Sequence, residues 1–317
     1  MVSNYGADPR SDGSAGVLSP YSSGLVTALT STEVWARLCA LPPYEESAVL
    51  QISAKLRQAG LAPDLVAAML TQSRLRTKAH VKFGSLADQM LFTVAGLEQA
   101  SRSVVAAAHA QRYLVAGVTK VADLTCGIGA DSLAFAEAGI QVLATDIDPE
   151  TAALAAWNLR QFPAAKVVCG DGLTTDFAAN GVDGLYADPA RRQSGGKRIF
   201  DPTAYAPPLD AIIALRTKVE AVGIKIGPGI SHQDIPADAE AQWVSVDGDV
   251  VECGLWFGTL ARQGPGFSAL LFRTGTTGGR SWKSMMTWLG MAGFAGRLHS
   301  AVSLVGLASS YTNQTAL

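Results

Sequence analysis

The regular alternation of short apolar strands with helical segments between residues 119 and 273 is the feature that most constrains the fold of this chain. The predicted strands lie at 120–126, 141–147, 165–169, 182–188 and 221–226. Helical periodicity separates several of them, at 130–138, 149–161 and 204–216. Because strands that alternate with crossover helices pair in parallel, the sequence predicts an α/β fold built on a doubly wound sheet.

The end of this region breaks the alternation. Residues 243–251 form two β-runs around Asp247-Gly248, a dipeptide typical of tight hairpin turns. A further strand at 267–273 is predicted to join this hairpin and to close the sheet in antiparallel fashion. The prediction is therefore a Rossmann-like, doubly wound, mostly parallel sheet with an antiparallel terminal hairpin.

The chain divides into segments of different composition. Residues 1–24 are rich in Gly, Ser, Pro and Asp and are predicted to be a disordered leader. Residues 25–117 have helical spacing, with a helix start at Thr32-Glu33, and are predicted to form a helical N-terminal domain. The sheet domain covers 118–273. Residues 274–317 are expected to be an atypical, poorly ordered tail, because they lack clean periodicity and helix caps.

Composition excludes several classes of protein. With 317 residues, 48% of them hydrophobic, the chain can bury a large core. Its net charge of −2 gives no global positive field, so any contact with nucleic acid must come from local patches. The four cysteines form no CxxC pair, which argues against a zinc site and favours the reducing cytoplasm. The sequence shows no signal peptide, and its uncharged stretches are interrupted, so neither a metal nor a membrane is an expected partner.

Polar residues follow the first three predicted strands at the points where the strands end. Gly127 and Gly129 form a strand-to-helix turn that lets a ligand approach the backbone, and the next helix offers unpaired N–H groups. Asp146 ends the second strand about 20 residues later, where a carboxylate can accept hydrogen bonds from ribose hydroxyls. Asp148-Pro149 competes for that role but is typical of a helix cap. Asp171, after the third strand, can accept from an adenine amino group; ordinary turn and loop roles are the alternatives.

The fourth predicted strand ends in Asp188-Pro189. The Asp188 carboxylate could align an acceptor group or take its proton as bonding proceeds, and the alternative is that this pair only terminates the strand. Arg191 and Arg192 then begin a basic loop around Gly195-Gly196. That loop could hold phosphates, or it could be an ordinary solvated loop.

A second basic run lies in the helical N-terminal region. Arg74 and Arg76 are followed by Lys78, His80 and Lys82, interleaved with apolar residues and without an acidic residue. Such a run predicts contacts with the phosphate backbone of RNA, and the alternative is one exposed face of a helix.

Four motifs of the sheet region resemble those of class I S-adenosylmethionine-dependent methyltransferases. They are Asp123-Leu-Thr-Cys-Gly-Ile-Gly129, Asp146-Ile-Asp-Pro149, Gly170-Asp171 and Asp188-Pro-Ala-Arg191. The first two together are similar to motifs of RNA methyltransferases such as trimethylguanosine synthase. The resemblance implies S-adenosylmethionine as the cofactor, with Asp188 beside the transferred methyl group. The implied cofactor contacts are Asp123, Gly127, Gly129, Asp146 and Asp171.

Three further segments resemble a bacterial group of these enzymes that carries a THUMP-like domain. They are Thr71-Gln-Ser-Arg-Leu-Arg76 with Lys82-Phe-Gly84, Leu97-Glu-Gln-Ala-Ser-Arg102, and Trp243-Val-Ser-Val-Asp-Gly-Asp-Val-Val-Glu252. We therefore expect a cytoplasmic S-adenosylmethionine-dependent methyltransferase that acts on RNA. The alternatives are a small-molecule or protein methyltransferase on the same sheet, and a non-catalytic protein that binds the cofactor or RNA.

Overall fold

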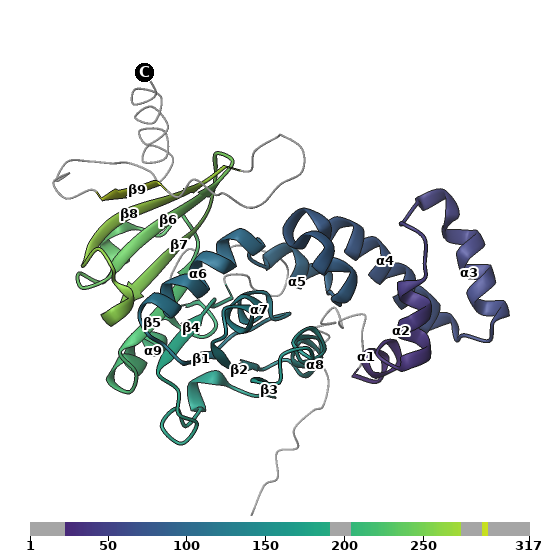
Figure 1. Cartoon of the computed structure of the whole chain (residues 1–317), viewed down its shortest axis with the longest axis horizontal. Coiled ribbons are helices and arrows are strands. Elements are labelled where there is room, and N and C mark those ends of the chain that lie inside the picture. Colours follow the sequence, from purple (N-terminus) through teal and green to yellow (C-terminus); the bar gives the residue numbers. More distant parts are fainter. Residues whose placement is uncertain (1–22, 191–203, 274–286, 291–317) are drawn as a thin grey trace, which may run out of the picture.

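In the described part of the chain, a nine-stranded sheet forms the centre of the computed structural model (Figure 1). The structure describes residues 23–190, 204–273 and 287–290, so the predicted leader and tail fall almost wholly outside it. The strands are β1 (Lys120–Asp123), β2 (Gln141–Asp146), β3 (Ala165–Cys169), β4 (Gly184–Ala187), β5 (Ala221–Ile226), β6 (Glu240–Val246), β7 (Asp249–Phe257), β8 (Gly266–Phe272) and β9 (Thr287–Gly290). They lie in the order β3-β2-β1-β4-β5-β7-β6-β8-β9.

The pairing of the strands confirms the mostly parallel sheet. Strands β1 to β5 are parallel to their neighbours among themselves, and β7 runs antiparallel to both β5 and β6. The turn between β6 and β7 has positive φ at Asp247 (54°) and at Gly248 (94°), as a tight hairpin requires. The predicted hairpin is therefore confirmed as well.

The direction of β8 differs from the prediction, because β8 pairs with β6 in parallel and not in antiparallel fashion. Trp256, near the end of β7, lies opposite Glu240 at the start of β6. Gly266, the first residue of β8, lies opposite the same Glu240. The connection between β7 and β8 thus passes the start of β6. Strand β8 then lies on the edge of β6 opposite to β7 and runs in the same direction as β6. The sequence pattern identifies this strand but carries no information about its direction.

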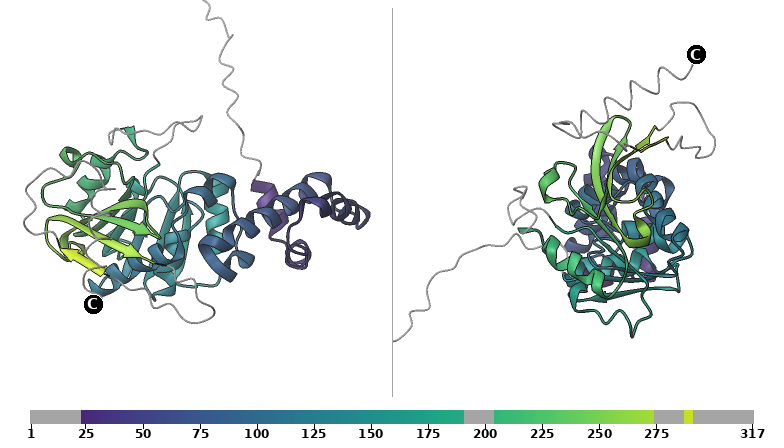
Figure 2. Two further views of the ribbon diagram at one scale, coloured as in Figure 1. Left: turned by 90° about the horizontal axis from the view of Figure 1, so that it is seen from above. Right: turned by 90° about the vertical axis from the view of Figure 1, so that its left-hand side faces the viewer.

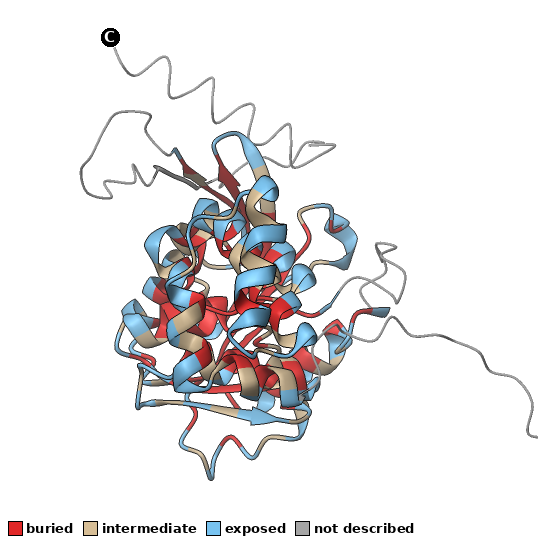
Figure 3. Cartoon of the chain, turned by 90° about the vertical axis from the view of Figure 1, so that its right-hand side faces the viewer, coloured by how far each residue is buried: buried red, intermediate tan, exposed pale blue. Residues whose placement is uncertain are grey.

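Helices cover both faces of the sheet (Figures 1 and 3). They are α1 (Ser23–Leu29), α2 (Thr32–Cys39), α3 (Val49–Gln58), α4 (Pro63–Phe83), α5 (Val94–Gln99), α6 (Ser103–Val115), α7 (Ala130–Glu137), α8 (Pro149–Asn158) and α9 (Leu209–Ala214). Alternation along β1 divides the core: Val121 packs with α4, α6 and α7, and Ala122 packs with α9 on the other face. Helix α9 is shorter than predicted because Pro207 and Pro208 disfavour helical backbone just before it.

The N-terminal helices form a smaller core at one end of the molecule (Figure 2). This core joins α1, α2, α3 and the first half of α4, and it includes Leu154 of α8. The rings of Trp35 in α2 and Trp157 in α8 make an edge contact, with their centroids 4.7 Å apart, and the guanidinium of Arg160 stacks over both rings. Helix α4, 21 residues long, runs from this core to the sheet. The N-terminal helices are therefore packed directly onto the α/β part of the chain.

Helix α6 is fixed to the sheet by buried contacts. Arg112 Nη1 lies 2.9 Å from Oε2 of Glu240, and both side chains are almost fully buried. The Tyr113 hydroxyl donates to the carbonyl oxygen of Leu185. Gly223 leaves room for this contact, since a Cβ there would lie 2.5 Å from the Tyr113 hydroxyl oxygen. Helix α6 is thus part of the layer that covers the sheet.

Candidate active site

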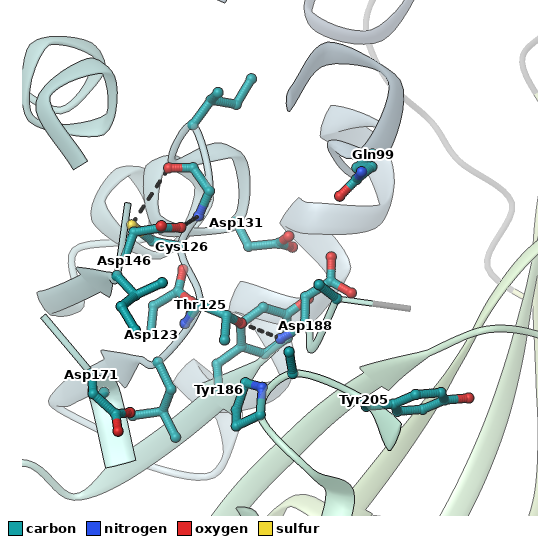
Figure 4. A pocket seen from close by; sticks show the side chains of 18 of the residues that line it. Gln99, Asp123, Thr125, Cys126, Asp131, Asp146, Asp171, Tyr186, Asp188 and Tyr205 are labelled. Carbon is teal, nitrogen blue, oxygen red and sulfur yellow. Dashed lines mark hydrogen bonds between the residues drawn. The ribbon is translucent and has the colours of Figure 1, made fainter. Parts of the chain in front are cut away.

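A cavity of about 510 Å³ opens at the carboxyl ends of the parallel strands (Figure 4). Its wall collects residues that follow β1, β2, β3 and β4, together with residues of α5 and of the segment before α9. Five predicted site residues line it: Asp123, Gly127, Asp146, Asp171 and Asp188. Asp146 and Asp171 lie on one side and Asp188 on the other (Figure 4). We call this space the first cavity.

Asp146 ties the end of β2 to the glycine turn after β1. Its Oδ2 accepts the N–H of Gly127 at 3.0 Å, and its Oδ1 accepts the N–H of Asp148 at 3.0 Å. Burial raises the pKa of Asp146, and these two backbone donors oppose the shift. Gly127 has a φ of 54°, in the left-handed region that favours glycine. The turn therefore presents backbone, and not a side chain, to the first cavity.

Gly129 lies behind the wall of the first cavity, which differs from the predicted cofactor contact. It has a φ of 86° and immediately precedes α7. A Cβ at this position would lie 3.7 Å from the backbone of Ala155, in α8. The glycine is needed for the turn that starts α7.

Asp148 caps a helix, as predicted. Its Oδ1 accepts the N–H of Thr151 at 2.7 Å at the start of α8, and Asp148 is not among the residues that line the first cavity. The two neighbouring carboxylates are thus separated in position, because Asp146 faces the cavity and Asp148 faces the helix.

Asp171 begins a short 3-10 turn after β3, and its Oδ1 accepts the N–H of Leu173 at 2.9 Å. The next residue, Gly172, lies so close to the turn after β1 that a Cβ would come within 2.6 Å of the carbonyl oxygen of Leu124. Ile147 lies on the same wall and is 77% exposed, although it is strongly apolar. This side of the first cavity therefore combines a carboxylate with an uncovered apolar surface.

Asp123 lines the first cavity but is almost fully buried. Its Oδ2 accepts the Ser132 hydroxyl at 2.6 Å, and its Oδ1 accepts the N–H of Thr125 at 3.3 Å. Burial raises the pKa of Asp123 to about 7, although the Ser132 hydroxyl opposes the shift. Its observed bonds hold the turn after β1 in shape.

Asp188 follows β4 and is fixed from two sides. Its backbone N–H donates to Oγ1 of Thr125 at 2.7 Å, and its Oδ2 lies 2.5 Å from Nζ of Lys225 on β5. Burial alone would lower the pKa of Lys225, but the charges of Asp188, Asp131 and Glu252 outweigh burial and raise it. Lys225 is therefore a fixed positive charge next to the Asp188 carboxylate.

A chain of buried polar side chains continues from Lys225. Its Nζ donates to the Ser101 hydroxyl at 3.0 Å, and that hydroxyl donates to Asp131 at 2.8 Å. His109 lies between two acids, 2.8 Å from Asp131 (Nδ1) and 2.7 Å from Glu252 (Nε2). We call these five residues and Asp188 the buried network.

The charges of the buried network stabilise one another. Burial would lower the pKa of His109, but Glu252 and Asp131 outweigh it and raise this pKa to about 9. Burial would raise the pKa of Asp131, but its bond to His109 and the nearby positive charges lower it to about 2. At neutral pH the network therefore holds an imidazolium and an ionised Asp131.

The sequence interpretation missed the buried network, although two signals were present. Lys225 is the only charged residue in the otherwise apolar strand β5, and Glu252 interrupts an apolar run in β7. A charged side chain in a buried strand requires a partner. The identity of the partners, from segments far away in the sequence, could not be inferred.

The predicted RNA contact at Arg76 is wrong, because the side chain is buried. Its Nε donates to the carbonyl oxygen of Met90 at 3.1 Å, and its guanidinium stacks over Trp35 at 4.6 Å. Lys82 is also directed inward, and its Nζ donates to the carbonyl oxygens of Leu97, Glu98 and Ala100 at 2.6–2.8 Å. Arg74 is exposed on the same helix. The basic run is therefore not a single exposed face.

Other predictions concern residues with simpler outcomes. Arg191 and Arg192 lie outside the described residues. Cys126 and Cys253 are buried thiols, and burial raises the pKa of each, which is typical of core residues and not of nucleophiles. Within the described ranges, no group of three or more His, Cys, Asp or Glu side chains is arranged to hold a metal ion. No helix in those ranges has the length and apolar character needed to cross a membrane.

Comparison with known proteins identifies two regions. Residues 25–79 match a family described as a domain of unknown function, DUF8688, and residues 121–190 match the family described as a methyltransferase domain. Two curated relatives from Mycobacterium tuberculosis, strains CDC 1551 / Oshkosh and ATCC 25618 / H37Rv, are each named as an uncharacterized S-adenosylmethionine-dependent methyltransferase. Both are 33% identical to this chain over 198 residues. The match covers 60% of this chain and 53% of each relative, so the chain spans about half the length of the curated relatives it matches.

A solved structure supports the same architecture. The crystal structure of a proposed methyltransferase from Porphyromonas gingivalis W83 has a TM-score of 0.57 and 20% sequence identity. The structural match covers 79% of this chain and 67% of the Porphyromonas gingivalis chain. The sheet has the methyltransferase fold, and residues 121–190 are similar to a methyltransferase domain.

Proposed function

We propose that this chain transfers the methyl group of S-adenosylmethionine to RNA. The observation that carries the proposal is that one cavity collects the glycine turn, Asp146, Asp171 and Asp188 from the ends of four strands. Ligands of open α/β sheets bind outside the carboxyl ends of the strands, which is where this cavity lies.

The charge of the first cavity fits this cofactor. Its wall contains five aspartates, two of which, Asp131 and Asp188, are already paired with His109 and Lys225, and no Lys, Arg or His is among the described residues that line it. S-adenosylmethionine carries a positive sulfonium and a positive amino group, so nearby carboxylates stabilise it. The same carboxylates would repel the pyrophosphate of a dinucleotide. The wall therefore favours S-adenosylmethionine over a nicotinamide cofactor.

Individual residues of the first cavity could bind separate parts of the cofactor. A carboxylate has about four lone-pair positions, and the two backbone donors on Asp146 leave capacity for ribose hydroxyls. The exposed apolar surface of Ile147 would be covered by the adenine ring, and Asp171 would accept its amino group. Asp123, with its observed bonds to Ser132 and Thr125, would support the turn.

The cofactor, when bound, supplies a methyl group that its sulfonium makes electrophilic. The protein then has to hold an acceptor close to that methyl, in line with it and shielded from water. Asp188 lies across the first cavity from Asp146 and Asp171 (Figure 4). We assign it the role of aligning the acceptor.

RNA is proposed as the acceptor because two basic residues directly follow the site in the sequence, because α4 exposes a further arginine, and because the motifs resemble those of RNA methyltransferases. The basic residues are Arg191 and Arg192, directly after the site, and Arg74 on α4. A small-molecule acceptor is the second candidate. It is favoured by the inward direction of Arg76 and Lys82, which removes two cations from the basic surface.

Calorimetric titration with S-adenosylmethionine tests the cofactor assignment directly. We expect binding to the wild-type protein and its loss in Asp146→Ala. The matched control is Asp210→Ala, which removes an exposed aspartate on α9. Equal binding by both variants would remove the ribose role of Asp146. Failure of the wild type to bind would overturn the proposed function.

Incubation with radiolabelled S-adenosylmethionine and separate pools of RNA, protein and metabolites tests the acceptor. Label in RNA supports the proposal, and label only in the metabolite pool supports the second candidate. Asp188→Ala should bind the cofactor as the wild type does but should lose transfer. Full transfer by this variant would discard its role.

A further inference from the structure

A second cavity of about 350 Å³ adjoins the first one. Four residues line both spaces: Gln99, Ala100, Asp188 and Ala190. The rest of the wall comes from the end of α4, the α5–α6 segment, β5 and β7, including Lys82, Arg102, Lys225, Val251 and Glu252. Unlike the first cavity, the second one carries side chains of both signs. Asp188 thus lies at the boundary between an acidic space and a mixed one.

The Asp188 carboxylate is held in one place at this boundary. Lys225 contacts it at 2.5 Å, and Lys225 is itself fixed by Ser101 at 3.0 Å. Ser101 is fixed in turn by Asp131 at 2.8 Å. Because Lys225, Ser101 and Asp131 are buried and each is bonded to the next, these contacts hold Lys225 beside Asp188.

The ammonium group of Lys225 decides what Asp188 can do chemically. A positive charge in contact with a carboxylate favours its ionised form and makes it a weaker base. Such a carboxylate is poorly suited to remove the proton of a hydroxyl before methyl transfer. It is well suited to accept a hydrogen bond from an N–H group and so to orient an amino nitrogen, whose lone pair is available without loss of a proton.

We propose that the second cavity holds the methyl acceptor, that the methylated atom is an amino nitrogen donating an N–H to Asp188, and that Lys225 is the positioning residue for this carboxylate. The inference rests on the proposed methyl-transfer function and specifies its acceptor.

The proposed step balances without another reactant. The nitrogen lone pair forms the new N–C bond while the C–S bond breaks, and the electrons of that bond stay on sulfur, which becomes a neutral thioether. The nitrogen gains a positive charge. One of its protons then leaves through Asp188 to water, which restores the carboxylate and a neutral methylated amine.

The amino group could belong to a nucleobase or to a small aromatic amine, both of which are neutral at pH 7, and the methylation pools distinguish these sources. The products of the labelled pool are hydrolysed and analysed by mass spectrometry. An N-methylated product supports the inference. A methylated hydroxyl, such as a 2′-O-methyl ribose, would overturn it while leaving the proposed methyltransferase function in place.

A pair of substitutions on one strand tests the position of the acceptor. Val251→Phe fills the second cavity, which this residue lines, and Val250→Phe places the same ring against the core on the opposite face of β7. We expect Val251→Phe to lower methyl transfer at least tenfold while calorimetry shows unchanged cofactor affinity. Val250→Phe should retain transfer. Retained transfer in Val251→Phe, with a folded protein, would contradict the assignment of the second cavity.

Variants at Lys225 test its positioning role through the pH dependence of transfer. Charged or titratable groups on every neighbouring element face the region of Asp188. On the sheet and its covering helices they are Asp123 at the end of β1, Tyr186 on β4, Lys225 on β5, Glu252 on β7, His109 on α6 and Asp131 on α7. Around the second cavity they are Lys82, Glu98 and Arg102.

Without the ammonium of Lys225, the remaining nearby acids favour protonation of Asp188. Transfer by Lys225→Met should therefore fall about tenfold more at pH 6 than at pH 8, relative to the wild type. Lys225→Arg should restore a wild-type profile. An equal loss at both pH values in Lys225→Met would indicate a structural role only and would contradict the inference. Thermal melting of each variant confirms that the protein compared is folded.

Discussion

The two cavities are built in different ways, although they share a wall. The first cavity is made mainly of turns that directly follow β1, β2, β3 and β4, and its Asp146 and Asp171 carboxylates are held by bonds within those turns or between adjacent strands. The second cavity depends on side chains distant in the sequence. Ser101 and Lys225 are 124 residues apart, and His109 and Glu252 are 143 apart.

This difference has an energetic meaning. Bonds within the turns are exposed or half-buried, so each contributes modestly to stability. The buried network holds several charges away from water, and each charge depends on the others for stabilisation. Buried ionic groups are seldom the most stable way to fill a core, so their presence beside Asp188 supports the positioning role proposed above for Lys225.

Removal of His109 should have the largest effect on stability. His109→Ala leaves Asp131 and Glu252 buried without their common partner, and the expected loss is about 3–5 kcal/mol of unfolding free energy. Urea denaturation measures it. The control is His80→Ala, which removes an exposed contact with Asp88 and should cost at most about 1 kcal/mol. Equal losses in both variants would erase the energetic contrast between buried and exposed charges.

The contribution of His109 should also depend on pH. Its pKa is raised from 6.5 to about 9, so its stabilisation is fully present below pH 6.5 and is lost as the pH rises through 9. The advantage of the wild type over His109→Gln should therefore shrink by roughly 3 kcal/mol between pH 6 and pH 9.5. Denaturation at several pH values gives this difference. A constant difference would contradict a charged His109.

In the first cavity, neighbouring carboxylates should have separable effects. Asp148→Ala removes the cap of α8 and should cost about 1 kcal/mol of stability without changing affinity for S-adenosylmethionine. Asp146→Ala should instead lose affinity for S-adenosylmethionine, in addition to the stability that its bonds to the N–H groups of Gly127 and Asp148 contribute. Thermal melting and calorimetry on both variants provide the comparison. A loss of cofactor affinity in Asp148→Ala as large as in Asp146→Ala would show that the two roles are not separate.

The smallest effect is expected on α4, where exposed and buried arginines alternate. Arg74→Gln should leave stability unchanged and should reduce the salt dependence of RNA binding by about one unit of slope. Arg76→Gln should instead lower the melting temperature, since its buried bond to Met90 is lost. Filter binding at several salt concentrations measures the slope. An unchanged slope in Arg74→Gln would exclude this residue from an RNA surface.

The sequence allowed prediction of the features that depend on neighbouring residues. The strand alternation, the hairpin at Asp247-Gly248 and the cap at Asp148 are local patterns, and the structure confirms them. The direction of β8 and the partners of Lys225 depend on how distant segments meet, and no local pattern contains that information.

Arg76 shows a further limit of sequence reasoning. A basic run suggests an exposed face, yet α4 is covered on more than one side by the N-terminal core and by the sheet. Whether a cation in such a helix meets solvent or carbonyl oxygens depends on those coverings. The first cavity could therefore be anticipated in outline, whereas the wall that carries the buried network could not.

The three carbonyl contacts of Lys82 give the N-terminal helices a direct part in the walls of both cavities. Through them, the last turn of α4 holds the segment that carries Gln99 and Ala100, which line both cavities. A protein cut immediately before β1 would keep every glycine and aspartate of the recognised motifs and still lack one side of both compartments. A shortened chain that keeps the walls of both cavities therefore has to include α4, α5 and α6.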